Sequence, residues 1–162
     1  MNSKYALGAV VAALPLLVVA QEKKEESGKE SRTAYLRRAY EKDRGTYGDA
    51  CRAILSLAAG EHTDADFAAV QKDLAGRGIV DPDWGLAESD KLTKGTLAYM
   101  VVKTLGIKGG VTMSLFGTTR RYALRECVYL RLMSEGATDE YVTGRELIDI
   151  VTNAEIYRER KP

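Results

Sequence analysis

From residue 33 onward, apolar positions recur three or four residues apart, which is the period of an amphipathic α-helix and not of a strand. The pattern predicts five or six helices, over residues 33–43, 47–59, 63–76, 93–105, 119–133 and 143–158. None of the three prolines lies inside a predicted helix. We therefore expect an all-α fold, a small helical bundle.

Residues suited to helix ends support these boundaries. Gly60 and Gly106 follow predicted helices, where glycine can adopt the left-handed conformation of a C-terminal cap. Thr63 can cap the N-terminus of the third helix. Thr143 and Glu146 have the spacing of a capping box at the start of the last helix.

The N-terminal region differs from the rest of the chain. Residues 1–20 are a weakly basic start followed by an apolar run, which is typical of a secretory signal peptide cleaved before Gln21. An uncleaved anchor is the alternative, but about fifteen apolar residues fall short of the ~20 that cross a bilayer. Residues 21–32 contain no apolar residue, so we expect a disordered charged linker. The α-helical domain then occupies residues 33–162, outside the cytosol, in the periplasm or at the cell surface.

One segment of the chain repeats. Leu92-Thr93-Lys94, followed by Leu97 and Val101, matches Val142-Thr143-Gly144, followed by Leu147 and Val151. A predicted helix ending in an apolar pair precedes each segment, so a helix, a loop and a Thr-capped helix occur twice. A third complete copy is not visible, although residues 47–59 match half of one.

The first copy resembles an S-layer homology repeat. The resemblance rests on Asp66-Phe67, Gly78-Ile79-Val80, Trp84 and Leu92-Thr93-Lys94, and it covers residues 66–107 well and residues 121–157 less closely. In that family the repeats commonly work in threes. A Thr-Arg pair at the start of the second helix helps to hold an anionic cell-wall polymer there.

The resemblance implies a ligand-binding role for several residues of this chain. Thr93-Lys94 keeps the threonine and a cation, while Gly95-Thr96 replaces the family's Ala-Glu. Thr143 is followed by a displaced Arg145. Exposed amides at these helix N-termini would attract an anion, and the adjacent cation would add charge-assisted hydrogen bonds. The alternative is that both threonines are only helix caps. The residues given this role are Trp84, Thr93, Lys94, Thr143 and Arg145.

A second candidate surface is the basic outer side of the fifth predicted helix. Arg120 and Arg121, with Arg125 and Arg131, could contact an anionic glycan or a phosphate-rich polymer. The alternative is a solvated face partly paired with Glu126.

Composition excludes several kinds of protein. Lys and Arg number 24 against 23 Asp and Glu, without the basic excess of a nucleic-acid-binding protein. Two cysteines and one histidine are too few for a zinc site. The acidic residues 81–90 do not fit a calcium-binding EF-hand, because Gly85, Leu86 and Leu92 fall where its fifth ligand, its glycine and its glutamate belong. We expect neither a metal nor another cofactor.

The glycine-rich residues 109–117 do not form a phosphate-binding loop, since they lack the Gly-Lys-Ser/Thr ending and no strand precedes them. Leu115 and Phe116 instead suggest a crossover that plugs the core, or an apolar docking patch. Cys51 and Cys127 both lie on inward stripes. In an exported protein they could form a disulfide, or remain two buried free thiols.

No set of residues assembles a nucleophile, a base and an oxyanion hole, so we do not expect an enzyme. A small hydrolase would have to depend on His62, which lacks the needed neighbours. The sequence favours a cell-envelope module that binds an anionic wall or envelope polymer through its helix N-termini. The alternative is a periplasmic protein–protein interaction module without a glycan ligand. After cleavage no membrane span should remain, and the oligomeric state stays open.

Overall fold

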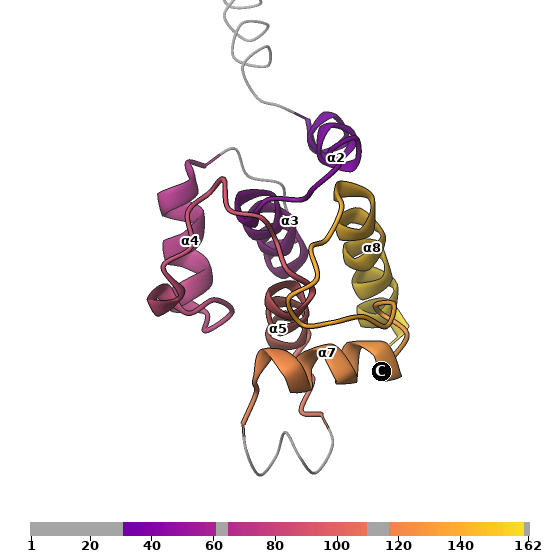
Figure 1. Ribbon diagram of the computed structural model, residues 1–162. Coiled ribbons are helices and arrows are strands. Elements are labelled where there is room, and N and C mark those ends of the chain that lie inside the picture. Colours follow the sequence, from indigo (N-terminus) through magenta and orange to yellow (C-terminus); the bar gives the residue numbers. More distant parts are fainter. Residues whose placement is uncertain (1–30, 61–64, 110–116, 161–162) are drawn as a thin grey trace, which may run out of the picture. The chain divides into compact units, whose positions relative to one another are not determined.

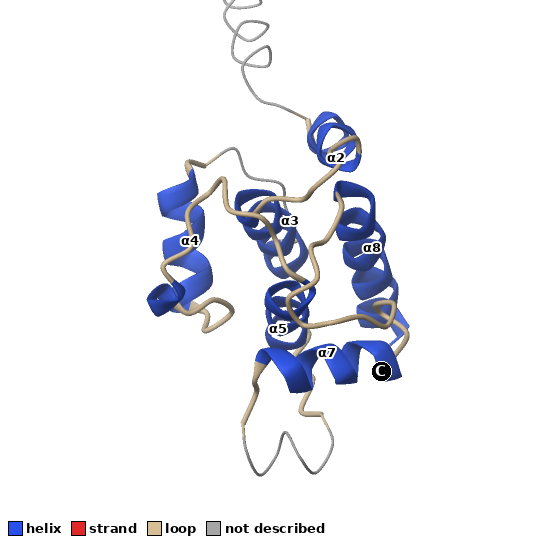
Figure 2. Ribbon diagram, in the orientation of Figure 1, coloured by secondary structure: helices blue, strands red, loops and turns tan. Residues whose placement is uncertain are grey.

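The computed structural model describes residues 31–60, 65–109 and 117–160, and within these ranges the chain is all-α, as predicted (Figures 1 and 2). The described elements are α2 (Arg32–Tyr40), α3 (Tyr47–Ala59), α4 (Phe67–Gly76), the short 3₁₀ helix η1 (Pro82–Trp84), α5 (Lys94–Thr104), α7 (Arg120–Tyr129) and α8 (Gly144–Arg160). None of these helices has the length and apolar character needed to cross a membrane. The expected leader, most of the linker, His62, Thr63, Leu115 and Phe116 lie outside the described residues.

Three helix boundaries differ from those predicted by three residues or more. α2 ends at Tyr40, three residues before the predicted end at 43. α4 begins at Phe67, because the Asp66 carboxylate accepts a hydrogen bond from the Ala69 amide at 2.7 Å and so caps the helix. α7 ends at Tyr129, four residues before the predicted end at 133. Arg131 there adopts a positive φ of 59°, which reverses the chain after the helix.

The described chain contains three helix–loop–helix units, one more than the sequence repeat predicted. α2 and α3 form the first unit, α4 and α5 the second, and α7 and α8 the third. Thr46, at the start of α3, is an N-cap like Thr93 at the start of α5. The additional unit is therefore the first one, of which only residues 47–59 were recognisable as half a copy in the sequence.

The loops of the three units join in a closed ring of backbone hydrogen bonds. The Gly45 amide donates to Val142 O at 2.8 Å, the Val142 amide to Leu92 O at 2.9 Å, and the Leu92 amide to Gly45 O at 3.0 Å. Each unit thus contributes one donor and one acceptor, from the residue directly before its N-cap threonine. Behind this ring, α3, α5 and α8 pack against one another.

The helices α3, α5 and α8 are here termed the central helices. The first backbone amide of each donates a hydrogen bond to the loop of another unit. Tyr47 donates to Asp90 O at 2.8 Å, Lys94 to Glu140 O at 2.8 Å, and Gly144 to Lys42 O at 3.0 Å. An α-helix cannot satisfy these amides internally, so here the loop of a neighbouring unit does so.

The first helix of each unit, α2, α4 or α7, lies outside the central helices and packs on one of them. α2 packs on α8, α4 on α3 and α7 on α5, so each outer helix covers the central helix of another unit (Figure 1). An ion pair between Arg32 and Glu155 fastens α2 to α8. The core between the helices is apolar; its largest fully buried side chains include Tyr35, Tyr47, Ile54, Leu57, Leu74, Leu92, Leu97, Met100 and Leu147.

Close approach of the backbones requires glycine at the start of the central helices. A Cβ on Gly144 would overlap the carbonyl oxygen of Ala39 and lie 2.9 Å from that of Lys42. A Cβ on Gly95 would overlap the Thr138 side chain and lie 2.9 Å from the Thr138 carbonyl oxygen. Backbone atoms cannot move aside as a flexible side chain can, so these glycines hold the units in contact.

We expect Gly144→Ala to lower the free energy of unfolding by about 3 kcal/mol, because the methyl group separates α8 from the first unit. Gly76→Ala is the matched control, since a Cβ there has no neighbour within 4 Å among the described residues; it should change stability by less than about 1 kcal/mol. Urea denaturation followed by far-UV circular dichroism measures both. Equal stability of the two variants would contradict the packing described here.

Candidate functional site

The predicted threonine caps are present, and the N-terminus of α5 is not open to a ligand. Thr143 and Glu146 form the predicted capping box, with the Glu146 amide 3.1 Å from Thr143 Oγ1 and the Thr143 amide 2.9 Å from Glu146 Oε2. Thr93 Oγ1 accepts from the Thr96 amide at 3.4 Å. The cap interpretation thus accounts for both threonine side chains.

The other amides of α5 are also engaged. The Lys94 amide donates to Glu140 O, and the Gly95 amide donates to Thr138 O at 2.9 Å. The first three amides of α5 therefore all have partners within the protein. An anion-binding site made by this N-terminus, as the sequence suggested, has no amide left to form it.

Lys94 is an internal cross-link and not an exposed ligand-binding cation. It is 3% exposed, and its Nζ lies 2.9 Å from Glu140 Oε1 and 3.1 Å from the Glu135 carbonyl oxygen. Glu146 Oε1 lies 4.0 Å away. The hydrogen bond from Lys94 lowers the pKa of the Glu140 carboxyl. The predicted role of Lys94 is corrected, because all of these partners belong to the third unit and tie it to the second.

Lys94→Met should therefore lower the free energy of unfolding by about 2 kcal/mol, through loss of hydrogen bonds made by a buried charged group. Lys72→Met, at an exposed position of α4, should have little effect. Urea denaturation provides the comparison. A Lys94→Met protein of unchanged stability that loses polymer binding would restore the ligand role.

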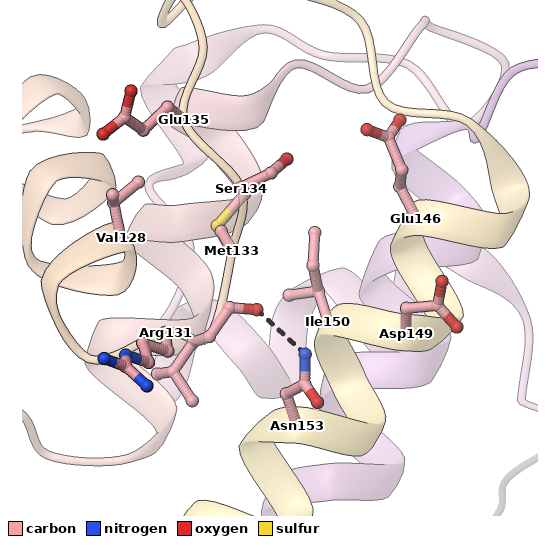
Figure 3. Close-up of a pocket in the computed structure, with 10 residues that line it drawn as sticks. Val128, Arg131, Met133, Ser134, Glu135, Glu146, Asp149, Ile150 and Asn153 are labelled. Atoms are coloured by element: carbon pink, nitrogen blue, oxygen red, sulfur yellow. Dashed lines mark hydrogen bonds between the residues drawn. The ribbon is translucent and has the colours of Figure 1, made fainter.

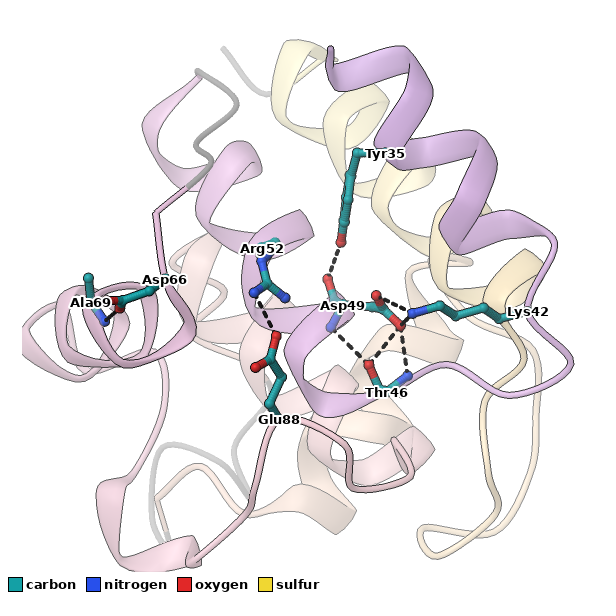
Figure 4. A network of polar contacts seen from close by, with 8 residues as sticks. All are labelled: Tyr35, Lys42, Thr46, Asp49, Arg52, Asp66, Ala69 and Glu88. Carbon is teal, nitrogen blue, oxygen red and sulfur yellow. Dashed lines mark hydrogen bonds and ion pairs between the residues drawn. The ribbon is translucent and has the colours of Figure 1, made fainter. Parts of the chain in front are cut away.

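The first unit has an equivalent polar network, which the sequence analysis missed (Figure 4). Thr46 and Asp49 form a capping box, and Lys42 Nζ lies 2.7 Å from Asp49 Oδ2. The Tyr35 hydroxyl donates to the Asp49 carbonyl oxygen at 2.6 Å. Arg52 and Glu88 form an ion pair that links the first unit to the second, at 2.6 Å. The spacing of Thr46 and Asp49 was the available signal, since Asp can replace Glu in a capping box.

Two of the predicted residues meet where the second and third units join. The Arg120 guanidinium carbon lies 4.4 Å from the centroid of the Trp84 ring, a cation–π contact. Trp84 also meets Tyr99 edge to face, with ring centroids 5.2 Å apart. Both Trp84 and Arg120 are partly exposed, so this contact reaches the surface.

Beside this contact, α7 borders a hollow of about 520 Å³, here termed the α7 hollow. It is lined by Arg121, Leu124, Arg125, Val128 and Tyr129 of α7 and by residues 135–138. Tyr129 is 80% exposed, which makes it the most exposed large hydrophobic side chain of the described residues.

The cations of the α7 hollow are not neutralised by the protein. In residues 31–60, 65–109 and 117–160, neither Arg121 nor Arg125 forms an ion pair, although Glu135 also lines the hollow. The pairing with Glu126 that the sequence left as the alternative does not occur there either. Arg121, Arg125 and Tyr129 are four residues apart and so share one face of the helix. Tyr129 is not among the predicted residues, although its helical spacing from Arg121 and Arg125 identifies it.

A second hollow, of about 400 Å³, lies between α7 and α8 (Figure 3). Glu135, Glu146 and Asp149 give it an acidic lining, and Asn153 donates to the Leu132 carbonyl oxygen at 3.4 Å. This hollow shares Val128 and Glu135 with the α7 hollow. Its carboxylates disfavour an anion, so the basic surface ends here.

Arg145 does not join either hollow. It is exposed, and its guanidinium carbon lies 5.1 Å from the centroid of the Tyr40 ring on α2.

Among the described residues, no three His, Cys, Asp or Glu side chains come together in a group that could hold a metal ion. The residues that gather around α7 are therefore Trp84, Arg120 and Arg121 of the predicted set.

No protein-family model, curated protein or solved structure matches this chain. Its function is therefore inferred from the side chains that the fold brings together.

Cys51 and Cys127 are free thiols, and both are fully buried. They do not form the disulfide considered from the sequence; the Cys127 thiol instead donates to the Ala98 carbonyl oxygen of α5 at 3.8 Å. Burial raises the pKa of each thiol to about 12.

Both thiols should therefore resist Ellman's reagent in the native protein at about pH 8, since a pKa of about 12 lowers the thiolate fraction about a thousandfold. After denaturation without reductant, both should react at once. Absence of any free thiol in the denatured protein would instead reveal a disulfide.

Proposed function

We propose that this chain is a non-catalytic module of the cell envelope that binds an anionic envelope polymer in the α7 hollow. The observation that carries the proposal is the pair of unneutralised arginines, Arg121 and Arg125, beside the exposed ring of Tyr129. The proposed binding surface is thus the outer face of α7 and not the threonine-capped helix N-termini, since the amides of α5 and the Gly144 and Glu146 amides of α8 are engaged.

The geometry suits a polymer with repeated anionic groups. Arginines four residues apart on a helix have Cβ atoms roughly 6 Å apart, so two neighbouring phosphate or carboxylate groups can each receive a bidentate contact. Tyr129 offers an aromatic surface to a sugar ring, while Leu124 and Val128 supply an apolar floor. Arg120 adds a further cation next to Arg121, although its guanidinium rests on Trp84.

The S-layer homology resemblance supports a location at the envelope. In that family repeats commonly work in threes, and the three units found here agree with such an arrangement. The departure lies in the cation after the threonine. The first residues of α3, α5 and α8 are Tyr47, the buried Lys94 and Gly144, so none supplies a free cation. Export through the leader of residues 1–20 belongs to the same proposal.

The direct test is co-sedimentation of the protein with purified peptidoglycan sacculi that retain their secondary polymer. Binding should weaken as salt rises, and Arg121→Ala/Arg125→Ala should weaken it at least about tenfold, because each charge-assisted contact contributes about 1.5 kcal/mol. The control is Lys72→Ala/Arg77→Ala, which removes one exposed positive charge from the middle of α4 and one, paired with Asp73, from the residue after that helix.

Two results would contradict the proposal. One is equal binding by wild type and the α7 variant, and the other is a loss of the same size in the control. Association with an envelope protein that is insensitive to salt would support the alternative of a protein–protein interaction module.

A further inference from the structure

We propose that Arg44, Lys91 and Tyr141 form a second anion-binding site, here termed the axial cluster, which takes a phosphate group. It shares no residue with the α7 hollow and does not depend on that hollow's function.

The ring of backbone hydrogen bonds brings these residues together. Arg44, Lys91 and Tyr141 directly precede the ring residues Gly45, Leu92 and Val142, so each unit contributes the same position. Isolated antiparallel bridges, Thr46 with Lys91 and Thr93 with Tyr141, further fix the backbone here. The cluster is thus built on the most constrained part of the loops, although its side chains lie at the surface.

The side chains surround one aromatic ring. The Arg44 guanidinium carbon lies 5.1 Å and the Lys91 Nζ 5.4 Å from the centroid of Tyr141. All three residues are exposed, and Tyr141 keeps 46% of its surface open to solvent. The quadrupole of the ring attracts both cations and so holds two positive charges near each other.

These two charges lack the partners that neighbouring lysines have. Lys42 pairs with Asp49 and Lys94 with Glu140. In the described parts of the chain, neither Arg44 nor Lys91 has a carboxylate within ion-pair distance.

Asp43, next to Arg44 in sequence, is exposed and forms no ion pair with it among the described residues. The other two carboxylates adjacent to the cluster in sequence are engaged elsewhere. Asp90 accepts a hydrogen bond from the Ala87 amide at 2.8 Å, and Glu140 accepts one from the Ala137 amide at 3.2 Å besides its pairing with Lys94. Two like charges close to one ring repel each other, and an anion that contacts both relieves that repulsion.

A phosphate group fits this donor set. Arginine presents a planar fork that can bind two phosphate oxygens, and lysine adds a compact charge that can reach another. Because the cluster lies at the surface, a phosphodiester within a polymer can reach it as well as a free phosphate ion.

The test is a titration of the protein with inorganic phosphate and, separately, with a glycerol phosphate oligomer, followed by ¹H–¹⁵N NMR. We expect shifts of the Arg44, Lys91 and Tyr141 amides with at least one probe. Arg44→Ala/Lys91→Ala should raise the dissociation constant at least about tenfold, since two charge-assisted contacts are lost.

A matched control distinguishes this site from any cation on a ring. Lys103→Ala/Lys108→Ala also removes two exposed lysines, one of which lies 5.4 Å from the Tyr99 centroid, and it should bind as wild type does. Arg121→Ala/Arg125→Ala should also retain the shifts, which separates this site from the α7 hollow.

Binding of both probes supports phosphate recognition from either source. Binding of the oligomer alone supports the polymer as the source, and binding of inorganic phosphate alone supports the free ion. The proposal is overturned if neither probe shifts the cluster, or if the Arg44→Ala/Lys91→Ala protein, folded by circular dichroism, binds as wild type does.

Discussion

The closed ring of backbone hydrogen bonds through Gly45, Leu92 and Val142 is the constraint on which the rest of the structure depends. In the closed ring, the backbone amide and carbonyl of all three residues are hydrogen-bonded to one another. With only two units, one of these amides and one of these carbonyls would lack a protein partner. Pairing all six of these backbone groups within the protein therefore requires all three units. The same ring explains the engaged helix N-termini, because it holds the loops where their carbonyl oxygens meet those amides.

Local signals allowed much of the fold to be predicted from the sequence. The bounds of α3 and the capping box of α8 follow from helical periodicity and from side chains within one turn. The first unit was not recognised as a copy of the repeat because α2 is charged nearly all round and packs on α8, a helix about a hundred residues away. The end of α7 depends on the positive φ of Arg131, a residue type that gives no such signal.

The candidate site likewise has one part that local sequence predicts and one part that it does not. The shared face of Arg121, Arg125 and Tyr129 follows from spacing along one helix. The structural role of Lys94 does not follow from spacing, because its partners Glu135 and Glu140 belong to a loop of another unit. A lysine in a first turn is therefore ambiguous from sequence alone: it can serve a ligand, or it can join units. Only three-dimensional contacts separate the two roles.

The packing of α2 on α8 has a topological consequence. The ion pair between Arg32 at the start of α2 and Glu155 in the last turns of α8 joins the first described helix to the last. Connecting the end of α8 to the start of α2 with a linker that follows α8, and opening the chain in a loop between units, would preserve every helix pairing. The domain is therefore a natural candidate for circular permutation, in which any of the three units could stand first.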